Sequence, residues 1–229
     1  MSAEFGLGTL VHGTLRVSRD GALRRTGSSS DANVSSSGAG LAEVLISLAL
    51  VGLAASWAAP EVAALRRGVA LRAAAQDLGT EIRALRQEAA ALSRYQALAF
   101  EQRDGRWMLQ HLADGNRNGV RAAEVASGVD RRVGPPVDLQ QRWGAVRPGL
   151  PGTALPRVPP ARGALLPRGD PLQLSGTDRV SCAPDGSCTT GTIYLIAGGE
   201  EVAAVVVYGP TGRVRLWRYA PEAGTWMRY

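Results

Sequence analysis

An apolar run from Gly38 to Pro60, GAGLAEVLISLALVGLAASWAAP, is the strongest hydrophobic feature of the chain. It contains one charged residue, Glu43. About 21 helical residues, each rising about 1.5 Å, are enough to cross the ~30 Å hydrocarbon core of a bilayer. The run therefore predicts a single transmembrane helix over residues 39–60.

The helical pattern continues after Pro60, because apolar residues recur every three or four positions from Leu71 to Ala99. Most arginines fall off this stripe, which predicts an amphipathic helix over residues 61–102. A coiled coil would show the same spacing. The stripe leads from a membrane span into strand-like sequence, however, and this order favours a helix that packs on its own sheet. We expect Pro60 to kink the junction.

The segment 103–229 reads as a β-rich domain. Its clearest strands are GTIYLIAG, EVAAVVVYG, RVRLWRY and TWMRY, which predict an antiparallel meander. Residues 134–172 hold nine of the 13 prolines, and we expect an extended surface loop there rather than a PxxP recognition site. The predicted fold class is α+β, with a long N-terminal helix packed on a C-terminal antiparallel β domain.

Composition argues against an enzyme. The formal net charge is +6, and all 26 basic residues are arginine, which excludes a catalytic lysine. There is no Ser-His-Asp set around His111 and no recognisable pair of catalytic carboxylates. We therefore expect no cofactor and no small-molecule substrate. The mildly basic surface permits contact with nucleic acid or anionic lipid without requiring it.

Cys182 and Cys188 lie in CAPDGSC, where a Pro-Asp-Gly turn folds the chain back on itself. If this part of the chain is exported, the turn predicts a disulfide between them.

A second motif, ADGNRNG, places Asp114, Asn116 and Asn118 at the alternate positions of a calcium loop. Position twelve of such a loop is Val125, and the nearest acid, Glu124, comes one residue early. A plain Asx/Gly turn explains the same residues, so calcium stays the weaker of the two interpretations.

The N-terminal spacing resembles that of a type IV pilin. Cleavage after Gly38 would make Ala39 the first mature residue, Glu43 the fifth and Pro60 the twenty-second. In that family a prepilin peptidase cuts after a glycine and methylates the new amine, and the fifth-residue glutamate neutralises the amine of a neighbouring subunit. The resemblance assigns these roles to Gly38, Ala39 and Glu43, with residues 1–38 as a cytoplasmic leader.

Two features depart from the family pattern. Ala39 and Ala42 stand where the family usually has Phe and a bulky apolar residue. Cleavage after Gly40 is the other option, but it would leave Glu43 at the third position. A glutamate at the interfacial end of an ordinary signal anchor is the alternative interpretation of the whole segment.

The order of the later features is similar to that of the GspH/FimT family of minor pilins and pseudopilins: an amphipathic helix, a D-x-N-x-N-G turn, GTIYL and a GRVR hairpin. The resemblance implies a subunit of a type II secretion pseudopilus or a type IV pilus. Its partners would be other pilins and prepilin peptidase. It would be a single-pass inner-membrane protein with a periplasmic β domain, and would enter a filament by assembly, not catalysis.

Gly212 to Arg215 also resembles a motif through which some competence-associated members of that family bind DNA. Alternation along RVRLWRY places Arg213, Arg215, Trp217 and Tyr219 on one strand face. The candidate DNA contacts are Arg213, Arg215, Trp217 and Arg218, with phosphate contacts from arginine and base stacking on the aromatic ring. A surface strand with solvated arginines is the alternative.

Overall fold

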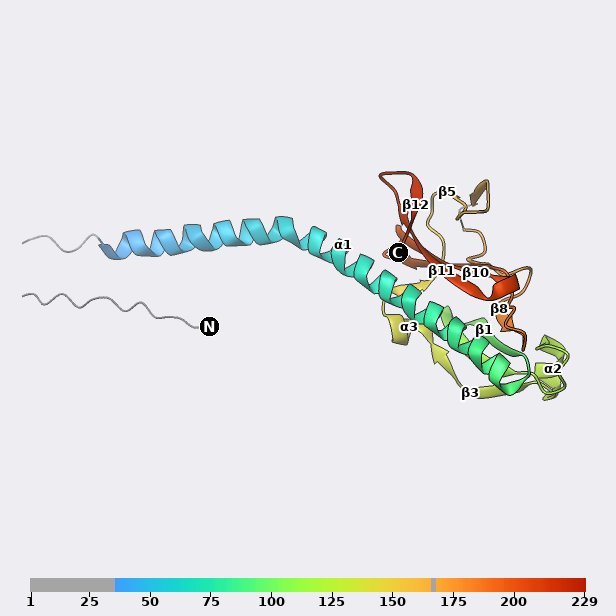
Figure 1. Ribbon diagram of the computed structural model, residues 1–229. Helices are drawn as coiled ribbons and strands as arrows, with labels where there is room; N and C mark the ends of the chain where they lie inside the picture. The colour runs from blue at the N-terminus through green and yellow to red at the C-terminus, as the bar shows by residue number, and fades with distance from the viewer. Residues whose placement is uncertain (1–35, 166–167) are drawn as a thin grey trace, which may run out of the picture. The chain divides into compact units, whose positions relative to one another are not determined.

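The computed structural model describes residues 36–165 and 168–229 and has an α+β fold (Figure 1). A long N-terminal helix packs against antiparallel sheets. The elements in chain order are α1 (Ser36–Leu92), β1 (Gln96–Arg103), β2 (Arg106–Ala113), α2 (Ala122–Ser127), β3 (Arg131–Asp138), α3 (Leu139–Trp143), β4 (Val146–Pro148), β5 (Leu155–Pro156), β6 (Ala164–Leu165), β7 (Leu172–Gln173), β8 (Arg179–Cys182), β9 (Gly191–Ala197), β10 (Glu201–Tyr208), the 3₁₀ turn η1 (Gly209–Thr211), β11 (Arg213–Ala220) and β12 (Thr225–Arg228).

Helix α1 has 57 residues and continues through Pro60, which stands inside it. Proline has no N–H, so the carbonyl of Ser56, four residues earlier, receives no helical hydrogen bond from position 60. The leader predicted for residues 1–38 lies outside the described residues, apart from its last three, which begin α1.

The amphipathic helix ends earlier than the sequence pattern predicts. It stops at Leu92 rather than at residue 102, and Ser93 adopts a positive φ of 49°. Gln96 then begins β1, an interior strand hydrogen-bonded to β2 on one side and β8 on the other. Four consecutive residues, 97–100, are buried, as expected for a strand covered on both faces and not for a helix stripe. Ala99 therefore belongs to the sheet.

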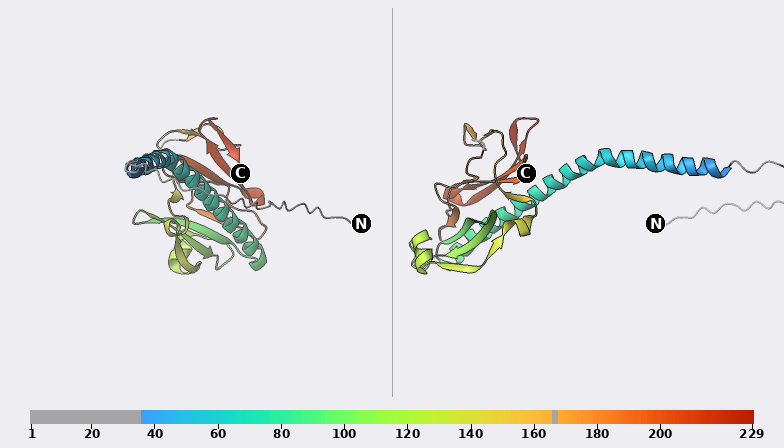
Figure 2. Two further views of the ribbon diagram at one scale, coloured as in Figure 1. Left: turned by 90° about the vertical axis from the view of Figure 1, so that its left-hand side faces the viewer. Right: turned by 180° about the vertical axis from the view of Figure 1, so that it is seen from behind.

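Two sheets make up the β region. The first has the strand order β3-β2-β1-β8, and the second β12-β11-β10-β9-β4, with β7 also paired to β9. All pairings are antiparallel. The meander predicted for the last strands is present as β9 to β12. Figure 2 shows the C-terminal half of α1 running across this β region.

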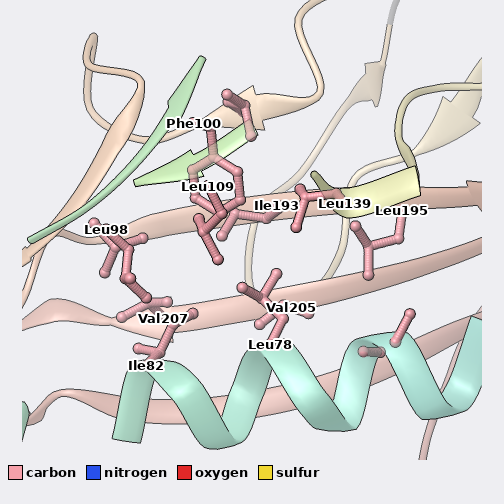
Figure 3. Packing of buried hydrophobic residues seen from close by; sticks show 14 of the residues in the cluster. Leu78, Ile82, Leu98, Phe100, Leu109, Leu139, Ile193, Leu195, Val205 and Val207 are labelled. Atoms are coloured by element: carbon pink, nitrogen blue, oxygen red, sulfur yellow. The ribbon is translucent and has the colours of Figure 1, made fainter. Parts of the chain in front are cut away.

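The main core lies between α1 and both sheets (Figure 3). Leu78 and Ile82 of α1 are fully buried against residues of both sheets, among them Leu98 and Val205. At Gly79 the helix comes so close to β11 that an added Cβ would lie 3.2 Å from Leu216. One stripe of α1 thus supplies the apolar cover for both sheets at once.

A smaller core covers the opposite face of the second sheet. It joins β5 and β6 to Tyr194, Trp226 and neighbouring residues of the sheet. The indole Nε1 of Trp226 donates a 2.7 Å hydrogen bond to the carbonyl of Pro156. The Pro-rich segment is therefore packed against the sheet by its own side chains.

The segment 134–172 is not the single extended loop that its prolines predict. It contains the end of β3, helix α3 and the short strands β4 to β7. Its strand prolines follow the expected rule. Pro135 and Pro136 of β3 lie where pairing with β2 is interrupted, between Val133 and Val137, and Pro148 lies on the edge strand β4. Arg142 of α3 ties the segment to α1 through Asp77 and Glu81.

Candidate functional site

The N-terminal part of α1 has the character of a membrane span. Within the described residues, α1 is the one helix long and apolar enough to cross a bilayer. Its most apolar stretch of 18 residues has a mean hydropathy of 1.9, and none of that stretch is buried. Its large side chains, such as Leu45, Leu50 and Trp57, are exposed. An apolar surface of this size requires lipid or protein around it.

Glu43 stands in this apolar stretch. Its side chain is exposed on α1, and in the described part of the chain it takes part in no ion pair. Residues one helical turn away, such as Ile46 and Ser47, carry no charge that could neutralise it. Gly38 and Ala39 lie in the first turn of the helix. A carboxylate in a lipid-facing segment calls for a cation supplied from elsewhere.

The second candidate region is the strand β11. Register with β10 pairs Arg213 with Tyr208 and Arg215 with Val206, so that both arginines lie on the face of the sheet that points away from α1. Both side chains are exposed, and neither makes an ion pair among the described residues. This strand face therefore presents two unpaired cations.

The aromatic residues of β11 are not free surface residues. Trp217 and Tyr219 pack against the smaller core, where the Tyr219 ring lies 5.4 Å from that of Trp226. The Trp217 Nε1 is buried and has no hydrogen-bond partner among the residues that the structure describes. The register confirms that Trp217 shares a strand face with the arginines, but its side chain is half-buried against the smaller core, which reduces the ring surface open to a base.

Arg218 is also separated from the arginine pair. Strand alternation places Arg218 on the same face as Leu216, toward α1. Arg228 of β12 is the register partner of Trp217 and lies on the opposite face. Arg213 and Arg215 are therefore together, and Arg218 faces a different surface.

Sequence reasoning missed Tyr208. Its side chain is 55% exposed at the end of β10, directly opposite Arg213. The short Gly209–Gly212 turn fixes the register of the two strands. The sequence therefore contained the information that the residue before the turn, Tyr208, pairs with the residue after it, Arg213. Tyr208, not Trp217, is the exposed aromatic residue beside the two arginines.

The turn before these arginines contacts two other parts of the molecule. Arg86 of α1 donates a 2.7 Å hydrogen bond to the carbonyl of Thr211, inside η1. Gly212 adopts a left-handed φ of 60°, and an added Cβ would lie 2.6 Å from the Gly186 carbonyl and 3.1 Å from the Cys188 sulfur. The GRVR hairpin is thus fixed to both α1 and the Cys182–Cys188 loop.

Cys182 and Cys188 form a disulfide. It closes the short loop after β8, where the two residues also face each other as an isolated antiparallel bridge. The cross-link holds the loop against the β10–β11 turn, where the Cys188 N–H donates to the Gly209 carbonyl at 2.8 Å.

The ADGNRNG segment forms an Asx/Gly turn. The buried Asp114 carboxylate accepts hydrogen bonds from the backbone N–H groups of Asn116, Arg117 and Gly119, at 2.8 to 2.9 Å. The side-chain amides of Asn116 and Asn118 both donate to Glu124. In this arrangement both carboxylate oxygens of Asp114 accept hydrogen bonds from backbone N–H groups, as in an Asx turn. The residues described include no group of three or more His, Cys, Asp or Glu placed to hold a metal.

Comparisons with known proteins give no relative: no family description, no curated protein and no solved structure matches this chain. What the structure supports is a pilin-like architecture, namely a long apolar N-terminal helix packed against antiparallel sheets.

Proposed function

We propose that this protein is a minor pilin or pseudopilin, a structural subunit of a type II secretion pseudopilus or a type IV pilus. The observation that carries the proposal is Glu43, which has no ion-pair partner among the described residues. It lies in the exposed apolar part of α1, while the other half of the same helix packs in the core of the β domain. Such a helix serves both as a membrane anchor and as part of a folded head.

In this function prepilin peptidase cuts after Gly38, and the methylated amine of Ala39 becomes the mature terminus. Glu43 of one subunit then pairs with the amine of its neighbour in the apolar interior of the filament. Opposite charges within about 4 Å attract strongly where water is excluded, so the pair selects the correct axial register. Pro60 lies at the junction of the lipid-embedded and head-packed halves.

The first prediction concerns the amino terminus and Glu43. Mass spectrometry of the protein from its native host should give a mature chain that begins with methylated Ala39. Glu43→Ala should be cleaved normally but lose most filament incorporation, because the neighbouring amine has no counter-charge. Glu61→Ala, on the same helix beyond the apolar run, is the matched control and should assemble normally. An intact leader, or normal assembly of Glu43→Ala, contradicts the proposal.

A second candidate function is DNA binding by the head, as in natural competence. It is favoured by the exposed pair Arg213 and Arg215 beside Tyr208. Arginine contacts to phosphates release counterions, and an exposed tyrosine ring can stack on a base.

The second prediction tests this candidate on the full chain in mild detergent. Arg213→Gln with Arg215→Gln should weaken binding of single-stranded DNA and reduce the salt slope by about 1.4, which is about 0.7 for each phosphate that is no longer neutralised. Tyr208→Ala should weaken binding by about 1–3 kcal/mol without a change in the slope. Trp217→Phe, at a covered position, is the control. Salt-independent or undetectable binding by the unmodified chain removes this function.

A further inference from the structure

A groove of about 650 Å³ lies where α1 meets the last strand of the second sheet. Leu65 and Val69 of α1 line one wall, and Met227 of β12 lines the other. Their side chains are 70%, 62% and 50% exposed. The groove therefore offers an apolar surface to whatever lies beside it.

Arginines also line this groove. Arg72, Arg218 and Arg228 are exposed, and none of them takes part in an ion pair within the described part of the chain. The one acid in the lining, Glu201, lies 3.4 Å from the guanidinium of Arg67. By strand alternation the Arg228 side chain lies with Trp226 on the other face of β12, so Arg72 and Arg218 are the two cations without an ion-pair partner, among the described residues, on the α1 side of the groove.

The C-terminal Tyr229 helps to place these cations. The Arg72 guanidinium carbon lies 5.5 Å from the centre of the Tyr229 ring, in cation–π geometry. Burial raises the pKa of the Tyr229 phenol, and the nearby charges of Arg218 and Arg72 oppose that shift. Arg72 and Arg218 both line the groove together with Tyr229.

The groove begins just after the candidate span. Ala64, the first lining residue, follows Pro60 by four positions in the same helix, a rise of about 6 Å. The headgroup layer of a bilayer is about 5–8 Å thick on each side. Arg72 follows Pro60 by twelve positions, a rise of about 18 Å, so contact with that layer requires this part of α1 to lie tilted against the membrane, where the long arginine stem reaches back to it. The start of the groove thus lies at the depth of the membrane interface, and its charge and exposed apolar surface both suit that environment.

We propose that this groove binds the headgroup of an anionic phospholipid while the protein resides in the membrane. Arg72 and Arg218 contact the phosphate, and Leu65, Val69 and Met227 contact the glycerol region and the upper part of an acyl chain. The bound lipid holds the second sheet at the membrane surface. The inference depends on the candidate span and not on cleavage or filament assembly.

Lipid fits this groove better than nucleic acid does. Nucleic acid needs a track of cations along an open surface, and the apolar side chains here would gain nothing from a phosphate backbone. A phospholipid satisfies both kinds of side chain, and each basic residue near an anionic membrane surface strengthens attachment about fivefold.

The third prediction is tested on the full chain, reconstituted into nanodiscs of phosphatidylcholine alone or with added phosphatidylglycerol. Amide hydrogen exchange in β12 should be at least about fivefold slower with phosphatidylglycerol, and high salt should remove the difference. Arg72→Gln with Arg218→Gln should remove most of it. Arg213→Gln with Arg215→Gln, an equal charge change on another face, should retain it.

Three outcomes overturn the inference: equal exchange in both lipids, an equal loss in both double variants, or protection of β12 by DNA in phosphatidylcholine discs. The comparison of lipids with the unmodified chain does not depend on the folding of any variant. Unchanged exchange in β9 serves as the internal measure of folding. An uncleaved amino terminus would reject the pilin proposal and leave this comparison intact.

Discussion

Gln96 and Gln110 are both fully buried, but their amide groups are in different situations. The Gln110 Nε2 donates to the backbone carbonyls of His111, Val133 and Gly134, at 2.9 to 3.4 Å. Neither side-chain polar atom of Gln96 has a hydrogen-bond partner within the described part of the chain. A buried polar group without a partner costs about 1–3 kcal/mol, so Gln96 reduces the stability of the fold.

The fourth prediction compares these two positions. Gln96→Met should leave the free energy of unfolding unchanged or raise it by about 1–2 kcal/mol, because an unpaired amide is replaced by an apolar side chain of similar size. Gln110→Met should lower it by about 1–3 kcal/mol, because three carbonyls lose a shared donor. Urea unfolding of the full chain in detergent, followed by tryptophan fluorescence, measures both. Equal destabilisation by the two substitutions would show that Gln96 has a partner.

At the residue scale, sequence reasoning assigned strand faces correctly and exposure incorrectly. Alternation places Arg213, Arg215 and Trp217 on one face, as the register shows. It carries no information on what covers that face. Trp217 is covered because the Pro-rich segment packs there, through residues distant in sequence. Tyr208 was missed because its strand was considered without its partner across the turn.

At the element scale, the β10–β11 turn shows how a short motif depends on its neighbours. Gly212 and Gly224 both adopt a left-handed φ of 60°, but none of the described residues comes within 4 Å of a Cβ added to Gly224. The backbone cost of alanine is therefore the same at both positions, while the steric cost differs.

The fifth prediction follows from this pair. Gly224→Ala should lower the free energy of unfolding by about 1–2 kcal/mol, the cost of left-handed backbone for an L-residue. Gly212→Ala should lower it by about 1–3 kcal/mol more, because the new methyl group overlaps the Gly186 carbonyl and the Arg86 side chain. Thermal unfolding compares the two. Equal losses of stability at both sites would mean that the Arg86 side chain and the disulfide loop can move to make room for the added methyl group without an energetic cost.

The boundary of α1 shows a second limit of sequence reasoning. Apolar residues from Leu71 to Leu92 follow a helical spacing, and Ala99 extends it by coincidence. The QALAF segment is apolar at consecutive positions, which suits a strand buried on both faces as well as a helix. Only pairing with β2 and β8 decides between them. The α+β fold, in contrast, follows from long periodic segments that no single contact can reverse.

At the scale of the whole molecule, two pairs of arginines without ion-pair partners among the described residues lie on surfaces with different neighbours. Arg213 and Arg215 stand beside Tyr208 on the face turned away from α1. Arg72 and Arg218 line the groove next to α1. The net charge alone allows contact with nucleic acid or lipid without distinguishing them. The two proposed partners, DNA and lipid, are assigned to separate surfaces, so substitutions on one surface can be used as controls for the other.

Because Leu71, Leu78 and Ile82 lie in the core shared by both sheets, α1 forms part of the head as well as carrying the candidate membrane span. Removing the entire helix to obtain soluble protein would leave both sheets with an apolar face open to water. A fragment for crystallisation or NMR therefore has to begin soon after Pro60. The same arrangement means that a mechanical force applied to α1 just before the β domain acts directly on the hydrophobic core of that domain.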